Sequence, residues 1–97
     1  RYSRVLSLKN EFSKCFIKSD LVIMCPIYAA GESKNYRFNQ VKFANEISKN
    51  SKTQVLIIKN ENELFQYFKK NLISDEIIIG MGAGSISKWI TGLKSLL

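Results

Sequence analysis

Two arginines near the start of the chain suggest the clearest chemistry. Arg1 and Arg4 stand three positions apart in "RYSR", at the beginning of a helical pattern. Residues three apart on a helix lie on the same side, and a guanidinium binds a carboxylate or phosphate through two parallel hydrogen bonds. The unpaired N–H groups of a first helical turn would strengthen the attraction. The spacing is compatible with an anion-binding pair and, more commonly, with two solvated surface arginines.

A second polar group follows a short apolar run. The stretch "PIYAAGE" comes directly after residues 21–25, which we predict to be a strand. Open parallel sheets bind ligands at the carboxyl ends of their strands, so Tyr28, Gly31 and Glu32 would lie at such an edge. Glu32 could position an amine or a metal-bound water, although a solvated loop carboxylate has the same sequence appearance.

Three glycines then mark a turn between an apolar run and a helical pattern, in "IIIGMGAGSISKWI" (77–90). The spacing of Gly80, Gly82 and Gly84 is neither the dinucleotide fingerprint nor a phosphate-binding P-loop. Ser85 can cap the following helix. The sequence therefore predicts a structural strand-to-helix joint near the ligand edge of the sheet.

The composition is that of a small globular domain. The 97 residues suffice for one core, and no apolar run approaches the length of a membrane helix. The net charge of +7 comes mainly from dispersed lysines without interleaved aromatic residues. We therefore do not expect a nucleic acid or a membrane as a partner.

Cysteine and histidine usage excludes several kinds of site within this segment. The chain has no histidine, so a Cys–His nucleophile and a zinc site of the usual type are both excluded. Cys15 and Cys25 each stand in an apolar run, which predicts reduced, buried thiols.

The apolar runs at 21–25, 55–58 and 76–80 are short and β-branched, as in strands covered on both faces. Four helical patterns surround them. Their apolar stripes are Val5, Leu8, Phe12, Cys15 and Phe16; Val41, Ala44 and Ile47; Leu64, Phe65, Phe68 and Leu72; and Ile86, Trp89, Ile90, Leu93 and Leu97. The alternation predicts an α/β fold, a three-layer Rossmann-like parallel sheet flanked by helices.

Local signals place two of the helix starts. Asn39 and Asn60 are predicted N-caps, and Glu63 can close a capping box with Asn60. Gly92 interrupts the last helical pattern at a cost of about 1 kcal/mol relative to Ala.

The chain opens with a helix rather than a strand, so we expect the domain to be incomplete at its N-terminus. A missing strand would leave apolar surface uncovered, and the segment alone would then fold poorly. A free-standing flavodoxin-like binding or regulatory module without catalysis is the alternative, and it would apply if little more sequence preceded Arg1.

The ordered set "RYSR", "IYAAGE" and "MGAGSISK" resembles the C-terminal domain of the Mur ligases across the whole chain, residues 1–97. Within that family it is most similar to the members that join L-alanine to UDP-N-acetylmuramate. The resemblance implies a cytoplasmic, ATP- and Mg²⁺-dependent enzyme of peptidoglycan synthesis. ATP would activate the muramoyl carboxylate, and the amine of L-alanine would attack the acyl phosphate.

The resemblance also implies roles for particular positions. The segment would bind the amino acid and close the ATP site, while ATP and Mg²⁺ would be held mainly by other domains. Arg1 and Arg4 would face the carboxylate of L-alanine, and residues 28–32 would form a loop near the closed active site. Two departures remove further inferences, because Pro26 replaces a usually acidic residue and loop 33–38 lacks the Pro-Ile segment of the family.

Overall fold

The computed structural model describes residues 2–26, 39–71, 76–82 and 86–95 of the chain. It divides into two compact units, residues 1–57 and 58–97, which are described separately. The first unit contains α1 (Tyr2–Ser7), α2 (Lys9–Lys14), β1 (Leu21–Met24), α3 (Gln40–Ser51) and β2 (Gln54–Ile57). The second contains α4 (Glu61–Asn71) and α5 (Ile86–Lys94). No helix among these described residues is long and apolar enough to span a membrane.

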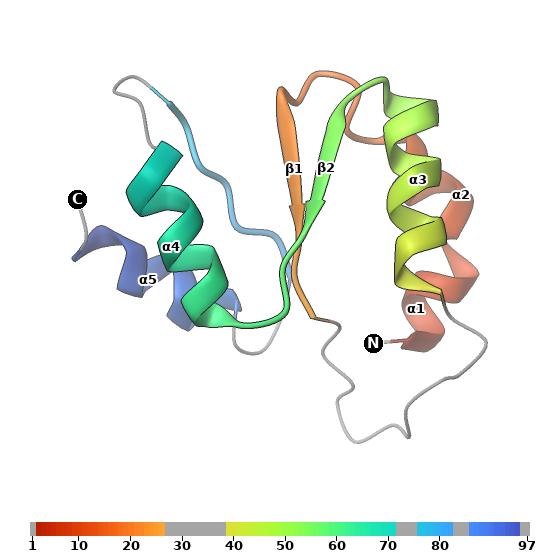
Figure 1. The fold of residues 1–97 in the computed structure, drawn as a ribbon. Coiled ribbons are helices and arrows are strands. Elements are labelled where there is room, and N and C mark those ends of the chain that lie inside the picture. Colours follow the sequence, from red (N-terminus) through yellow and green to blue (C-terminus); the bar gives the residue numbers. More distant parts are fainter. Residues whose placement is uncertain (1, 27–38, 72–75, 83–85, 96–97) are drawn as a thin grey trace. The chain divides into compact units, whose positions relative to one another are not determined.

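Parallel pairing of β1 and β2 forms the sheet of the first unit. Leu21 pairs with Gln54 and Met24 with Ile57, in unbroken register. Helix α3 lies between the two strands in sequence, as a parallel connection requires. In Figure 1, α2 and α3 lie side by side on the same side of the sheet, and α3 packs against β2. The predicted α/β class and two of the three predicted strands are confirmed.

Helix α3 supplies the core of the first unit. Phe43, Ala44 and Ile47 are buried on one face. The predicted cap is confirmed, because the Asn39 side chain accepts a hydrogen bond from the Lys42 backbone N–H at 3.0 Å. Val41 was expected on the apolar stripe but is 61% exposed. It lies about 100° around the helix from the centre of the buried face.

The first helical pattern is interrupted at Leu8, where φ is −113° and ψ is 16°, so two short helices replace one. Phe12 and Phe16 are half-buried, as their stripe predicts. The thiol of Cys15 is exposed, which corrects the expectation of burial. It lies in the turn after α2 and donates a hydrogen bond to the Phe12 carbonyl at 3.3 Å.

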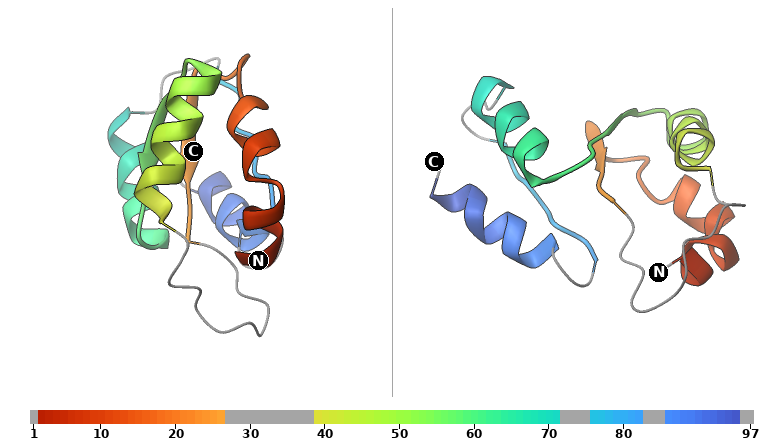
Figure 2. Two further views of the ribbon diagram at one scale, coloured as in Figure 1. Left: turned by 90° about the vertical axis from the view of Figure 1, so that its right-hand side faces the viewer. Right: turned by 60° about the horizontal axis from the view of Figure 1, so that its bottom comes forward.

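In the second unit, Asn60 caps α4 as predicted. Its side chain accepts a hydrogen bond from the Glu63 N–H at 2.9 Å. The Glu63 carboxylate reaches back to the N–H of Lys59, at 2.6 Å, rather than to that of Asn60. Figure 2 shows α4 and α5 of this unit, and Leu64, Phe68 and Leu93 are buried.

One side chain of α4 approaches Gly92 in α5. A Cβ at Gly92 would lie 2.8 Å from Cζ of Phe65 on α4. A side chain at this position would require the Phe65 ring to move.

The prediction of a third strand at residues 76–80 is wrong, since the described segment 76–82 contains no strand. Strand hydrogen bonds require a neighbouring strand, and the described part of the second unit offers none. Ile77, Ile79 and Met81, which alternate along the segment, are largely exposed.

Candidate functional site

Arg4 lies in the last turn of α1 and is exposed. Its backbone carbonyl accepts hydrogen bonds from the Ser7 hydroxyl and the Leu8 N–H, both at 3.1 Å. The single ion pair recorded among the described residues joins Lys9 to Glu46 and does not involve Arg4. Among the described residues, the Arg4 guanidinium has no ion-pair partner.

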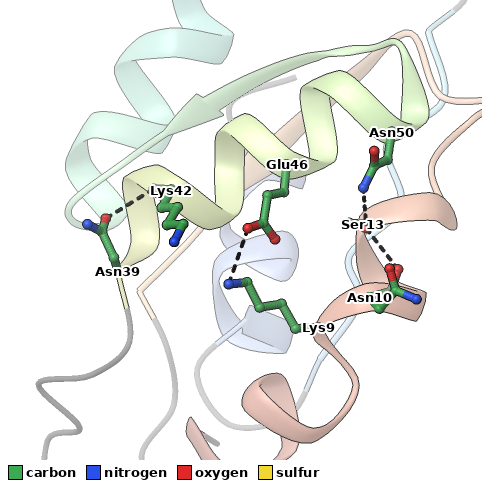
Figure 3. A network of polar contacts seen from close by, with 7 residues as sticks. All are labelled: Lys9, Asn10, Ser13, Asn39, Lys42, Glu46 and Asn50. Carbon is green, nitrogen blue, oxygen red and sulfur yellow. Dashed lines mark hydrogen bonds and ion pairs between the residues drawn. The ribbon is translucent and has the colours of Figure 1, made fainter.

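Helix α2, which follows Arg4, contacts α3 through Lys9, the first residue of α2. Lys9 Nζ on α2 lies 3.3 Å from Glu46 Oε1 on α3, and both side chains are about one-third exposed (Figure 3). Exposed ion pairs contribute about 0–1 kcal/mol. This contact alone therefore holds α2 on α3 only weakly.

Buried hydroxyls fix the other end of α2. The Ser51 hydroxyl donates to the Ser13 carbonyl at 2.6 Å and accepts from the Phe16 N–H at 3.2 Å. The Ser13 hydroxyl donates to the Asn10 carbonyl at 2.8 Å and accepts from the Asn50 amide at 2.9 Å (Figure 3).

A third hydroxyl extends the contact toward the sheet. Thr53 Oγ1 donates to the Ser19 carbonyl at 2.8 Å, which ties the turn before β1 to the start of β2. Ser13, Ser51 and Thr53, here called the hydroxyl seam, are the buried polar residues of the described chain. None of their buried side-chain atoms lacks a hydrogen-bond partner.

At the carboxyl end of β1, the chain leaves the sheet through Cys25 and Pro26. The Gln40 side chain, at the start of α3, donates to the Cys25 carbonyl at 3.2 Å. This bond joins the chain just before segment 27–38 to the chain just after it, one residue beyond Pro26 and Asn39, which flank the segment. Burial raises the pKa of the half-buried Cys25 thiol, so its neutral form is favoured.

The glycine-rich turn begins against α5. A Cβ on Gly80 would lie 2.5 Å from Cγ1 of Ile90. A residue with a side chain at position 80 could therefore not approach the helix as closely as this glycine does. Gly82 has a φ of +141°. An open hollow of about 210 Å³ is lined by Gly80, Gly82, Ile86, Ser87 and Ile90. The close approach to Ile90 on α5 accounts for Gly80. The predicted strand-to-helix joint is wrong in one respect, because the described residues 76–82 before the turn contain no strand.

Several predicted site residues lie outside the described residues: Arg1, Tyr28, Gly31, Glu32, Gly84 and Ser85. Of the predicted set, Arg4 and Gly82 are described, and they belong to different units. Within the described ranges, no group of three or more cysteine, aspartate or glutamate side chains is arranged to hold a metal ion.

Comparison with known proteins shows relatives along the whole chain. UDP-N-acetylmuramate–L-alanine ligase of Pelagibacter ubique is 42% identical over 97 residues, which are 100% of this chain and 21% of that protein. The enzyme of the same name from Prochlorococcus marinus is 34% identical over 90% of the chain and 18% of its own length. That from Rhodospirillum rubrum is 31% identical over 100% of the chain and 20% of its own length.

The chain is therefore a Mur ligase-related segment. The relatives that show this are consistently UDP-N-acetylmuramate–L-alanine ligases, and the chain spans about a fifth of their length. No protein-family profile matches the chain, and no solved structure matches it.

Sequence reasoning missed the hydroxyl seam and the Gln40 bond. A signal existed for Ser51, which stands four residues after Ile47 on the buried face of α3. A serine at an apolar position of a helix indicates a polar partner, because buried hydroxyls are hydrogen-bonded. That the partner is Ser13, 38 residues away, was not readable from spacing.

Proposed function

We propose that this chain is the C-terminal domain of an ATP-dependent ligase that joins L-alanine to UDP-N-acetylmuramate in peptidoglycan synthesis. The observation that supports it most directly is the 42% identity to such a ligase along the entire chain. The enzyme would be cytoplasmic, and this domain, Rossmann-like in its complete form, would bind the amino acid and close the ATP site.

The proposed role of the domain centres on its arginines. L-Alanine presents a carboxylate that must be held while its amine reacts, and an exposed guanidinium without a described carboxylate partner can bind it. Arg4, together with Arg1, is proposed to form this contact. Tyr28, Gly31 and Glu32 are proposed to form a loop near the closed active site, and Gly82, Gly84 and Ser85 the turn near the ligand edge.

ATP and Mg²⁺ are proposed to bind mainly to other domains of the ligase. The described residues offer no metal-ligand cluster, and the glycine turn lacks the lysine and the spacing of a P-loop. We therefore assign no step of phosphoryl transfer to this segment.

Replacing Arg4 by Ala in the full-length ligase that contains this chain tests the assignment. Loss of a charge-assisted contact costs on the order of 1.5–3 kcal/mol, so the KM for L-alanine should rise by about 10- to 150-fold. The KM for ATP should stay within twofold.

Lys14→Ala is the matched control, because it removes another exposed cation from the neighbouring helix α2. It should change neither KM. Equal losses for L-alanine and ATP in the Arg4 variant, or no loss at all, would refute the assignment.

A further inference from the structure

Helix α1, which carries Arg4, depends on α2 for its position. Among the described elements α1 has its main contacts with α2, to which it is joined at Leu8. It makes no comparable contact with β1, β2 or α3. Whatever fixes α2 on α3 therefore also fixes the place of Arg4.

Of the two attachments of α2, the buried one is the stronger. The Lys9–Glu46 pair is partly exposed, and such pairs contribute little. Ser51 is fully buried. Loss of its hydroxyl would leave the Ser13 carbonyl and the Phe16 N–H without their recorded partner, and unpaired buried groups are costly.

The Ser51 hydroxyl acts on α2 as a capping group supplied by another helix. Ser13 lies in the last turn of α2, where carbonyls have no partner within the helix. Ser51 provides that partner and also binds the N–H of the turn that follows. The Asn50 amide holds the Ser13 side chain from the same end of α3.

We propose that Ser51 is a positioning residue for amino-acid binding, which sets the position of Arg4 through α2 and is supported by Asn50. This inference rests on the proposed role of Arg4. Displacement of a substrate-binding group by about 1 Å can cost two orders of magnitude in rate, so a tilt of α2 would weaken capture of the substrate carboxylate.

The test is a double-mutant cycle in the full-length ligase. Ser51→Ala should raise the KM for L-alanine at least fivefold, while kcat and the KM for ATP stay within twofold. In an Arg4→Ala background, Ser51→Ala should cause no further rise, because the group that it positions is gone. A merely structural role would act equally in both backgrounds.

Two further variants complete the experiment. Asn50→Ala, at an exposed position, should act in the same direction with a smaller effect, and it replaces Ser51→Ala if that variant does not fold. Ser95→Ala, which removes a hydroxyl bond to the Gly92 carbonyl at 2.7 Å in the second unit, is the control and should change nothing.

The outcomes separate the two proposals. If Arg4→Ala raises the KM for L-alanine but Ser51→Ala and Asn50→Ala do not, the positioning role is refuted and the function of Arg4 stands. An equal rise in both backgrounds, or parallel losses of ATP and L-alanine binding, also refutes positioning. If Arg4→Ala itself has no effect, the proposed function of Arg4 fails and the inference fails with it.

Discussion

Lys52 follows the last residue of α3 with a φ of 53° and a ψ of 44°, in the left-handed region. This conformation is unfavourable by about 1–2 kcal/mol for an L-residue, whereas glycine adopts it freely. Helices commonly end with a glycine at this place. The lysine therefore holds a strained backbone at the end of the helix that carries Ser51.

Replacing Lys52 by Gly should stabilise the end of α3 by about 0.5–1 kcal/mol, because relief of strain exceeds the entropy cost of glycine. Hydrogen exchange of the amides in the last turn of α3 should slow by about two- to fivefold. Lys49→Gly, within the same helix, is the control and should accelerate exchange, since glycine disfavours a helix interior. Faster exchange in the Lys52 variant would contradict the strain argument.

The two cysteines should differ in reactivity. Cys25 is half-buried and burial raises its pKa, whereas Cys15 is exposed. Iodoacetamide attacks through the thiolate, so it should alkylate Cys15 first in the native protein at pH 8, as read from peptide masses. Both should react alike in denaturant. Preferential labelling of native Cys25 would contradict the structure.

The raised pKa of Cys25 also has a consequence for stability. The folded state keeps the thiol proton to higher pH than the unfolded state, whose thiol titrates near pH 8.5. The stability contribution of this group is therefore complete below that pH and is lost as the pH rises through the folded-state pKa. Urea unfolding of the native protein and of Cys25→Ala should be measured between pH 7 and pH 10. The difference between the two free energies of unfolding at each pH reports the Cys25 thiol, because the lysines titrate in both proteins.

Single-residue features were predictable where their partners are near in sequence. Asn39 and Asn60 each cap a helix by accepting from an N–H three residues on, so spacing alone revealed them. Ser51 and Gln40 bind groups 38 and 15 residues away. No local pattern encodes such partners, because tertiary packing brings them together.

At the scale of elements, the segment 76–82 depends on its approach to α5. A methyl group on Gly80 would meet Cγ1 of Ile90 at 2.5 Å and its Cδ1 at 3.0 Å. Neither the segment nor the helix can accommodate that group without moving, since Cγ1 is not the free end of the side chain. This contact is the clearest constraint on the glycine-rich turn.

Gly80→Ala should therefore weaken the contact by about 1–3 kcal/mol, the usual range for overpacking. Hydrogen exchange of the α5 amides should accelerate accordingly. Ile90→Ala removes the obstructing atoms, so the double variant should lose less than the sum of the two single variants. Strict additivity would show that the Gly80–Ile90 approach is not the cause.

The order of the elements and the parallel pairing of β1 with β2 were predictable, whereas the absence of a strand at residues 76–80 was not. Periodicity located α3, α4, α5, β1 and β2 correctly to within a few residues. The break at Leu8 has no sequence signal such as glycine or proline. Residues 76–80 have strand composition, but a strand forms only where another strand offers hydrogen bonds, and composition does not report that neighbour.

At the scale of the whole molecule, the chain corresponds to about a fifth of its curated relatives. The first unit provides the arginine-bearing helix, its attachment through the hydroxyl seam and the parallel strands. Phosphoryl chemistry is proposed to belong to the remainder of the ligase. The segment therefore acts, in this proposal, by holding one substrate for a reaction that other domains carry out.

The most direct measurement is an assay of the full-length protein that contains this chain, with ATP, Mg²⁺, UDP-N-acetylmuramate and single amino acids. We expect ADP release to require both UDP-N-acetylmuramate and L-alanine, with a product heavier than the sugar nucleotide by one alanyl residue. Release that is independent of L-alanine, or a product carrying a different amino acid in preference to it, would contradict the proposed function.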